Sequence, residues 1–282
     1  MYYTTLIDAD ALVRHLDSGW RVFDCRFALS NPSAGERAYV AGHIPGARYL
    51  HLDRDLASAV TPASGRHPLP EPGVLAAKLA AAGVGTGTQV VAYDDASGAF
   101  AARLWWLLRW LGHPQVAVLD GSWPLWLRDG RPVTHEPPAR SAPDDFRERP
   151  DDRMWVSSGL VLQRARAGVG RLLDARAAER FSGEQEPIDA VAGHVPGAIN
   201  LPYLGNISGD GRFKPAEALR TRFIAALDGP APAEAVCMCG SGVTACHNLL
   251  AMEVAGLSGG RLYAGSWSEW IRDSSRPVMR GP

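Results

Sequence analysis

The chain is poor in several features that would assign it to a common class of protein. It has four cysteines in 282 residues, and three of them are clustered, which does not resemble a disulfide framework; we therefore expect a reducing compartment, the cytoplasm. No run of about 18 apolar residues occurs, because Arg109 interrupts the stretch LWWLLRWLG, so the sequence predicts no membrane span. The opening stretch MYYTTLIDADALVRHLD lacks a basic start followed by an apolar core, so we expect no secretory signal.

A surplus of charge of either sign is also missing. The formal net charge is −1, which gives no bulk attraction to nucleic acid or to an anionic membrane, and we predict neither as a partner. Any anionic ligand must therefore be bound by local groups. Hydrophobic residues make up 46% of the chain and charged residues 21%, as in a soluble globular protein with a substantial core.

Internal repeats are the first positive feature. Three motifs of the first half return in the same order in the second half, with an offset of about 150 residues. They are RVFDCR (21–26) and RLLDAR (171–176), AGHIPGA (41–47) and AGHVPGA (192–198), and DGSWPLWLRDGRPV (120–133) and AGSWSEWIRDSSRPV (264–278). The pattern predicts duplication of one fold.

Two domains and a linker follow from this repeat. The stretch THEPPARSAPDDFRERPDDR (134–153) is rich in Pro, Asp and Arg and poor in apolar residues, as exposed linkers are. We predict a first domain over 1–138, a linker over 139–153 and a second domain over 154–282.

Short apolar runs alternate with helical patterns inside each half. Residues 21–25, 89–94, 171–175 and 235–239 are typical of buried parallel strands, and 100–112 and 244–257 of helices. Alternating strands and helices predict an α/β fold with mostly parallel sheets flanked by helices. Ligands of such sheets bind at the carboxyl ends of the strands.

The stretch AVCMCGSGVTACHNLL (235–250) lies at one such end. We expect Cys239 to be the last strand residue, followed by a turn with Gly240 and Gly242 that permits positive φ and a close backbone approach. Main-chain N–H groups of this turn, with a helix N-terminus behind them, would stabilise a thiolate or persulfide on Cys239.

The neighbouring cysteines have a different expectation. Cys237 lies inside the strand and Cys246 inside the helix, where a free cysteine usually acts as a small hydrophobe. Together with His247 they do not match a zinc-ligand spacing, and we expect His247 to be a packed or capping residue. We predict no metal and no cofactor.

The paired GHIPGA and GHVPGA motifs, the GSW motif near the end of each half and CGSGVTAC together resemble the two-domain rhodanese-like sulfurtransferases. The resemblance implies tandem rhodanese-like domains, the first without the cysteine and with Asp94 or Asp95 near its place. It also implies a site between the domains, where Cys239 takes up sulfane sulfur as a persulfide. The acceptor would be cyanide or a thiol, including a thioredoxin-like protein, and the loop residues Gly240, Gly242, Val243 and Thr244 would contact the small anionic donor.

The loop CGSGVT is similar to that of family members that use 3-mercaptopyruvate, whereas thiosulfate rhodaneses carry cationic residues there. Such members are proposed to use a Ser–His–Asp relay, which the resemblance assigns to Ser241, His67 and Asp53. Within it, His67 would move a proton as sulfur leaves, with Asp53 fixing the imidazole.

The resemblance also implies an arginine for the carboxylate of the substrate, and Arg180 before Phe181 matches it. A second arginine, usual after the dipeptide EP, is missing, because Ile188 stands there. EPIDAV is instead similar to thiosulfate rhodaneses. Arg66, beside His67, is the candidate to compensate.

Three alternatives stay open. One is a thiosulfate:cyanide sulfurtransferase with the same persulfide. Another is a cysteine hydrolase that uses Cys239, His67 and Asp53, which would need direct contact between imidazole and thiol. The last is a non-catalytic sulfur-binding module. The histidines of the twin motifs, His43 and His194, are expected to hold the fold, because they recur in the half without the cysteine.

Overall fold

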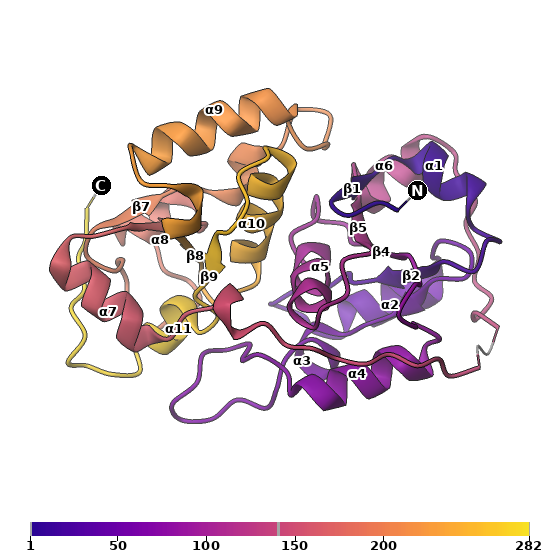
Figure 1. Ribbon diagram of the computed structural model, residues 1–282, viewed down its shortest axis with the longest axis horizontal. Coiled ribbons are helices and arrows are strands. Elements are labelled where there is room, and N and C mark those ends of the chain that lie inside the picture. The colour runs from indigo at the N-terminus through magenta and orange to yellow at the C-terminus, as the bar shows by residue number, and fades with distance from the viewer. Residues whose placement is uncertain (1, 140–141, 282) are drawn as a thin grey trace. The chain divides into compact units, whose positions relative to one another are not determined.

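Short parallel strands alternate with helices throughout the computed structural model, which describes residues 2–139 and 142–281 (Figure 1). The chain divides into two units. Unit 1 contains residues 1–58, 70–151 and 208–213, and unit 2 contains 59–69, 152–207 and 214–282. The α/β fold with tandem, similar domains is confirmed.

Unit 1 is built on a parallel sheet in the order β1-β5-β4-β2-β3. Its strands are β1 (Leu6–Ile7), β2 (Arg21–Asp24), β3 (Arg48–Tyr49), β4 (Val90–Tyr93) and β5 (Val116–Leu119). Its helices are α1 (Ala9–Arg14), α2 (Ala34–Ala41), α3 (Leu52–Asp55), α4 (Pro72–Ala81), α5 (Ala101–Trp110) and α6 (Ser122–Arg128).

Unit 2 has a parallel sheet in the order β7-β6-β8-β9. Its strands are β6 (Arg171–Asp174), β7 (Ala198–Asn200), β8 (Ala235–Met238) and β9 (Arg261–Leu262). Its α-helices are α7 (Ser158–Ala167), α8 (Ala178–Ser182), α9 (Ala216–Leu227), α10 (Thr244–Val254) and α11 (Ser266–Trp270), with 3₁₀ turns at Asp152–Met154, Tyr203–Asn206 and Pro232–Glu234.

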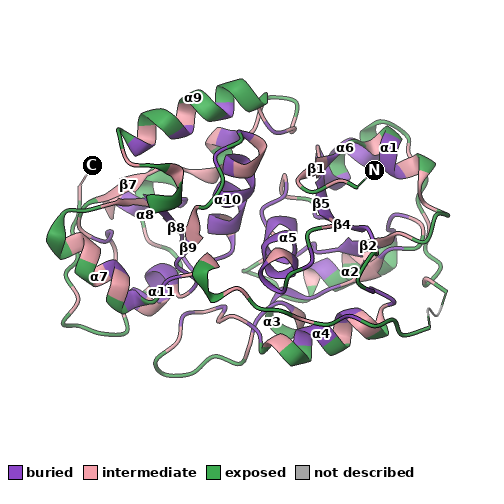
Figure 2. Cartoon of the chain, in the orientation of Figure 1, coloured by how far each residue is buried: buried purple, intermediate pink, exposed green. Residues whose placement is uncertain are grey.

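Helices cover both faces of each sheet, which explains why the central strands β4, β5 and β8 are buried at every position. Figure 2 shows that α5 and α10, which pack on these strands, are almost wholly buried, whereas α4 and α9 keep one exposed face. These two buried helices are the ones that follow β4 and β8, so each fixes the loop at the carboxyl end of its strand.

The duplication extends to individual buried contacts. In unit 1 the Arg26 guanidinium pairs with Asp24 at 2.5 Å and lies over the ring of Trp123 at 4.6 Å. The His43 ring stacks on Tyr39. The same contacts recur in unit 2 among Arg176, Asp174 and Trp267, and between His194 and Phe181. The expected structural role of the two histidines is confirmed.

The segment predicted as a linker is mostly exposed over its described residues, with one departure. Phe146 is buried and packs near His113, with ring centroids 5.6 Å apart. The boundaries 1–138, 139–153 and 154–282 stay a prediction. Among the described residues, none of the helices has the length and apolar character needed to cross a membrane.

Two short segments belong to the unit of the opposite half. Residues 59–69, from the first half, lie in unit 2, and residues 208–213, from the second half, lie in unit 1. In the latter, the Phe213 N–H donates to Asp120 at 2.8 Å. The first of these exchanges carries His67 and Arg66 into unit 2.

Candidate functional site

The loop of Cys239 begins one residue earlier than predicted. Strand β8 ends at Met238, so Cys239 is the first residue after the strand and not its last. Its N–H donates to Ser266 Oγ at 3.0 Å, and its carbonyl accepts from the Trp267 N–H at 3.0 Å. The GSW motif thus fixes the backbone from which the thiol projects.

A main-chain donor faces the sulfur. The Gly242 N–H lies 3.1 Å from Cys239 Sγ, and the Cys239 side chain is almost wholly buried. Gly242 has φ +77°, and a Cβ there would lie 2.2 Å from the Ala264 carbonyl oxygen. Only glycine satisfies both conditions. A main-chain N–H in this position would stabilise negative charge on the sulfur, and the role of Cys239 as a carrier stays a prediction.

Unit 1 carries the same loop with a carboxylate in place of the thiol. The carbonyl of Asp94 accepts from the Trp123 N–H, as that of Cys239 accepts from Trp267, so Asp94 rather than Asp95 is the equivalent residue. The Asp94 carboxylate accepts four main-chain hydrogen bonds of 2.7–2.9 Å, from residues 96, 98, 100 and 101. A loop of this design therefore holds an anion.

The other cysteines of the stretch pack as predicted. Cys237 is buried in β8, and burial raises the pKa of its thiol. Cys246 is buried in α10, and its thiol donates to the Gly242 carbonyl at 3.3 Å. His247 is buried and accepts from the Asn206 amide at 3.2 Å. In the described part of the chain, no three His, Cys, Asp or Glu side chains are grouped to hold a metal ion.

Ser241 and His67 meet, although 174 positions separate them in sequence. His67 Nδ1 lies 2.7 Å from Ser241 Oγ, and both side chains are buried. Segment 59–69 is held in place by the Arg66 N–H, which donates to Ser268 Oγ at 3.0 Å. Asp53 lies in α3 of unit 1, and its part in a relay stays a prediction.

Both predicted anion-binding arginines border the loop. A Cβ at Gly240 would lie 3.1 Å from Arg66 Nη2 and 3.5 Å from Arg180 Nη1. The next loop residues, Val243 and Thr244, lead into α10, which begins at Thr244. Ile188, which replaces the second arginine of the family pattern, is exposed.

Sequence reasoning missed the acids that accompany these arginines. Asp189 Oδ2 accepts from Arg180 Nη2 at 2.9 Å, and Asp189 Oδ1 pairs with Arg66 Nη1. Glu186 accepts from Arg180 Nε at 3.0 Å. Both acids stand in the stretch EPIDAV, whose departure from the arginine pattern was visible, but their partners could not be identified from spacing.

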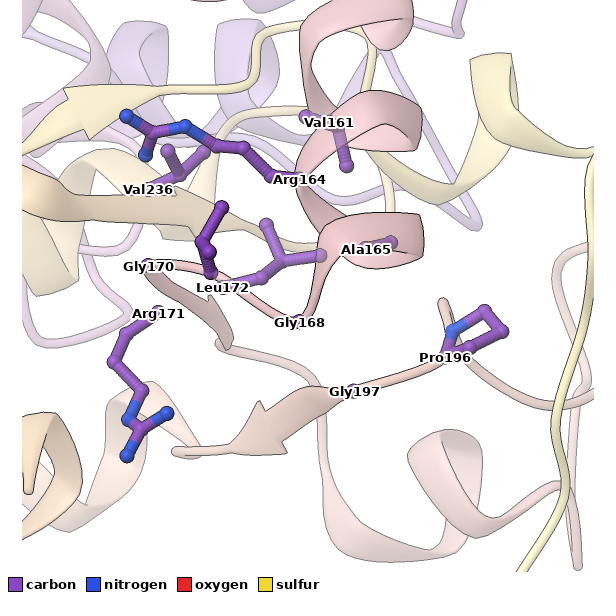
Figure 3. A pocket seen from close by; sticks show the side chains of 11 residues that line it. Val161, Arg164, Ala165, Gly168, Gly170, Arg171, Leu172, Pro196, Gly197 and Val236 are labelled. Atoms are coloured by element: carbon purple, nitrogen blue, oxygen red, sulfur yellow. The ribbon is translucent and has the colours of Figure 1, made fainter.

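Unit 2 also contains a cavity, which is separate from the Cys239 loop. A cavity of about 200 Å³ is lined by α7 residues such as Val161, by Leu172 and Val236 near the amino ends of β6 and β8, and by Pro196. Figure 3 labels these side chains. Cys239 follows the carboxyl end of β8. The cavity therefore lies at the opposite end of the strands from Cys239.

Known proteins resemble this chain over most of its length. The sequence-family model described as "Rhodanese-like domain" matches residues 8–129 and 159–273. A Pseudomonas aeruginosa protein named "Probable 3-mercaptopyruvate sulfurtransferase" is 51% identical over 263 residues, which cover 92% of each chain. The thiosulfate sulfurtransferase of Bos taurus is 34% identical and covers 90% of this chain and 85% of its own length.

Solved structures give the same result. The Escherichia coli protein described as a 3-mercaptopyruvate sulfotransferase aligns with a TM-score of 0.79 at 30% identity, over 94% of this chain and 100% of its own. The 3-mercaptopyruvate sulfurtransferase of Leishmania major aligns with a TM-score of 0.84 at 29% identity, over 95% of this chain and 74% of its own. The chain therefore belongs to the rhodanese family, as a sulfurtransferase with two rhodanese-like domains.

Proposed function

We propose that this sulfurtransferase moves sulfane sulfur from 3-mercaptopyruvate, through a persulfide on Cys239, to a thiol or cyanide acceptor. The observation that carries the proposal is the 2.7 Å contact between His67 and Ser241, inside the loop whose Gly242 N–H faces the Cys239 sulfur. A hydroxyl–imidazole pair can move a proton, which mercaptopyruvate chemistry requires and thiosulfate chemistry does not.

The first half-reaction breaks one C–S bond and forms one S–S bond. The Cys239 thiolate attacks the sulfur of mercaptopyruvate, and the electron pair of the C–S bond passes to carbon as the enolate of pyruvate. The thiol proton of the donor then moves to that carbon, with Ser241 and His67 as the carriers. The products are a Cys239 persulfide anion and pyruvate, and no other reactant is consumed.

Recognition of the donor carboxylate falls to the two arginines beside Gly240. Arg180 and Arg66 each turn a guanidinium toward this glycine, and guanidinium groups bind carboxylates through paired hydrogen bonds. Arg66 thereby takes the part of the arginine that Ile188 replaces. Asp53 completes the relay in this proposal as the group that orients His67.

In the second half-reaction the outer sulfur leaves with the acceptor. Cyanide takes it as thiocyanate, and a thiol takes it as a hydropersulfide, which returns Cys239 to the thiolate in both cases. A small thiol or a thioredoxin-like protein fits this step. All four cysteines are free, and cytoplasmic localisation, where thiol acceptors stay reduced, is part of the proposal.

Steady-state cyanolysis with each donor tests the donor preference. We expect kcat/KM for mercaptopyruvate to exceed that for thiosulfate. The opposite order would establish the second candidate, thiosulfate sulfurtransferase, which the exposed Ile188 and the similarity to the bovine enzyme favour.

The His67→Ala variant tests the relay. Loss of the proton carrier should lower mercaptopyruvate turnover about 100-fold, while His135→Ala, an exposed histidine of unit 1, serves as the control and should leave it unchanged. Mercaptopyruvate turnover that survives His67→Ala at the wild-type rate would remove the relay from the mechanism.

Mass spectrometry separates transfer from the other classes. Exposure to mercaptopyruvate should add one sulfur atom, about 32 Da, at Cys239, and Cys239→Ser should abolish the adduct. No adduct with either donor would support a non-catalytic module. Release of acid from thioesters, lost in Cys239→Ser, would support a hydrolase.

A further inference from the structure

The cavity at the amino ends of β6 and β8 has a filled counterpart in unit 1. Trp20 directly precedes β2 and Gly170 directly precedes β6, so the two residues hold equivalent positions in the repeat. The Trp20 side chain packs against the hydrophobic core of unit 1, and its ring stacks on that of His15 with centroids 4.1 Å apart. Gly170 has no side chain with which to fill the same space in unit 2.

Neighbouring positions also carry shorter side chains in unit 2. Helices α1 and α7 each follow an N-cap whose side chain accepts from the N–H three positions further on, which fixes the register of the two helices. Counted from these caps, Val161 stands in the place of Leu12. Ala165 stands in the place of Leu16, which packs on the core of unit 1. Val161 and Ala165 instead line the cavity, which therefore arises where large side chains are replaced by small ones.

The walls of the cavity match the core that Trp20 covers. In unit 1, Val22 pairs with Val91 across β2 and β4, and both belong to the cluster against which Trp20 packs. In unit 2, Leu172 pairs with Val236 across β6 and β8, and both line the cavity. An apolar cavity of about 150 Å³ is large enough to bind benzene. At about 200 Å³, this cavity can take a single or fused aromatic ring in the place of the Trp20 indole.

A cation accompanies this space. Arg164 lines the cavity and, counted from the same N-caps, takes the place of His15, which stacks on Trp20. Its Nη1 donates to the Glu234 carbonyl at 3.0 Å and lies 3.1 Å from the position of a Cβ at Gly170. Among the described residues, no carboxylate forms an ion pair with Arg164, and no acidic side chain lines the cavity. A guanidinium lies on aromatic faces and also binds carboxylates, so the cavity is complementary to a flat ring that bears an acid.

We propose that this cavity binds a small aromatic carboxylate, with its ring in the place that Trp20 fills in unit 1 and its carboxylate on Arg164. Arg171, which also lines the cavity, already pairs with Asp228 at 3.2 Å. Both arginines are labelled in Figure 3. Because Cys239 follows the opposite end of β8, the ligand is not the sulfur donor, and the site goes beyond the proposed function.

Calorimetric titration with indole-3-carboxylate tests the space. We expect saturable binding to the wild type. Ala165→Leu introduces the side chain that unit 1 has at the equivalent position, and by filling the cavity it should weaken binding at least about tenfold. Ala167→Leu is the matched control, because Ala167 is an exposed residue of the same helix, and it should leave the affinity unchanged.

The charge is tested by a second variant. Arg164→Gln should weaken binding of indole-3-carboxylate about tenfold and leave that of neutral indole unchanged. Arg166→Gln, at an exposed position of α7, is the control and should change neither affinity. Cyclohexanecarboxylate, which has no flat ring, should bind about fivefold more weakly than benzoate.

Three results would overturn the proposal. They are no saturable binding to the wild type up to about 5 mM, binding that Ala165→Leu leaves intact, and equal affinity for benzoate and cyclohexanecarboxylate. Thermal unfolding checks that the variants are folded, and Arg164→Gln decides alone if Ala165→Leu is not. The titrations involve no sulfur transfer, so their outcome is separate from that of the proposed function.

Discussion

At the scale of single residues, the site depends on one glycine with two constraints. Gly242 takes a left-handed φ of +77°, and its Cα lies so close to the Ala264 carbonyl that a Cβ would stand 2.2 Å from the oxygen. Its N–H also faces the Cys239 sulfur. The positive φ and the contact with Ala264 therefore both require glycine at position 242, and the N–H of the same residue faces the sulfur.

Gly242→Ala should have two effects: it should displace this N–H, and it should destabilise the fold. We expect loss of about 1–3 kcal/mol in the free energy of unfolding from strain and contact, and at least roughly a 100-fold loss of persulfide formation. Gly256→Ala is the matched control, because Gly256 has φ +69° with nothing within 4 Å of its Cβ position. Denaturant unfolding and sulfur loading measure both effects. Equal activity in the two variants would contradict the role of the Gly242 N–H.

The cysteines should differ in reactivity for the same local reasons. Burial and nearby carboxylates raise the pKa of Cys25, and burial raises that of Cys237. Both thiols therefore stay protonated near neutral pH, below their raised pKa values, and react slowly. The Gly242 N–H faces the Cys239 sulfur, so iodoacetamide should label Cys239 at least about tenfold faster. Peptide mapping measures the rates, and Cys239→Ser should remove the fast label. Faster labelling of Cys237 would contradict this order.

At the scale of elements, segment 59–69 is the part that turns a rhodanese loop into the proposed relay. It brings His67 to Ser241, and its backbone is tied to α11 through the Arg66 N–H and Ser268 Oγ. In the first repeat the equivalent position is Pro124, which has no hydroxyl. The second copy alone can hold the segment in this way.

Ser268→Ala should loosen that segment without unfolding unit 2. The variant loses two hydrogen bonds, one from the Arg66 N–H and one to the Gly265 carbonyl, at about 1 kcal/mol each. We expect the KM for mercaptopyruvate to rise about fivefold as Arg66 and His67 lose their fixed position. Ser258→Ala, which removes an exposed hydroxyl bonded to Glu253, is the control. Steady-state kinetics measures the KM, and thermal unfolding checks that unit 2 stays folded. An unchanged KM would show that other contacts hold the segment.

At the scale of the whole molecule, one fold is used twice with two different side chains at the same loop position. The loop after β8 carries the Cys239 thiol, and the loop after β4 carries the Asp94 carboxylate with four N–H donors. A carboxylate fixed in this manner stabilises its loop permanently, whereas a thiolate leaves its loop able to accept sulfur. Under the proposed function, the first unit is therefore structural at the position where the second is chemical.

Asp94→Asn tests that division. A neutral amide accepts weaker hydrogen bonds than a carboxylate, so the free energy of unfolding should fall by roughly 2–3 kcal/mol. Persulfide formation at Cys239 should continue at the temperatures where the variant stays folded. Asp129→Asn, an exposed aspartate of unit 1, is the control and should leave stability unchanged. Loss of sulfur loading by folded Asp94→Asn would contradict the structural role.

Much of this molecule could be predicted from sequence because its signals are local. The runs around β2, β4, β6 and β8 predicted their strands to within one or two residues at each end, since apolar composition and flanking glycines act over a few positions. The turn of Cys239 with Gly240 and Gly242 could be predicted from the sequence for the same reason. The misplacement by one residue at the end of β8 reflects a boundary that Ser266 and Trp267 fix from a distance.

The sequence by itself determined the duplication and the fold class and placed Cys239 at a glycine-flanked turn, because repeats, hydrophobic periodicity and turn residues are all read along the chain. Only the tertiary structure decided that segment 59–69 joins unit 2 and that Asp189 bridges Arg66 and Arg180. Those contacts join residues up to 202 positions apart. Packing, hydrogen-bond geometry and charge balance in three dimensions determine which residues form these contacts, and no local sequence pattern encodes them.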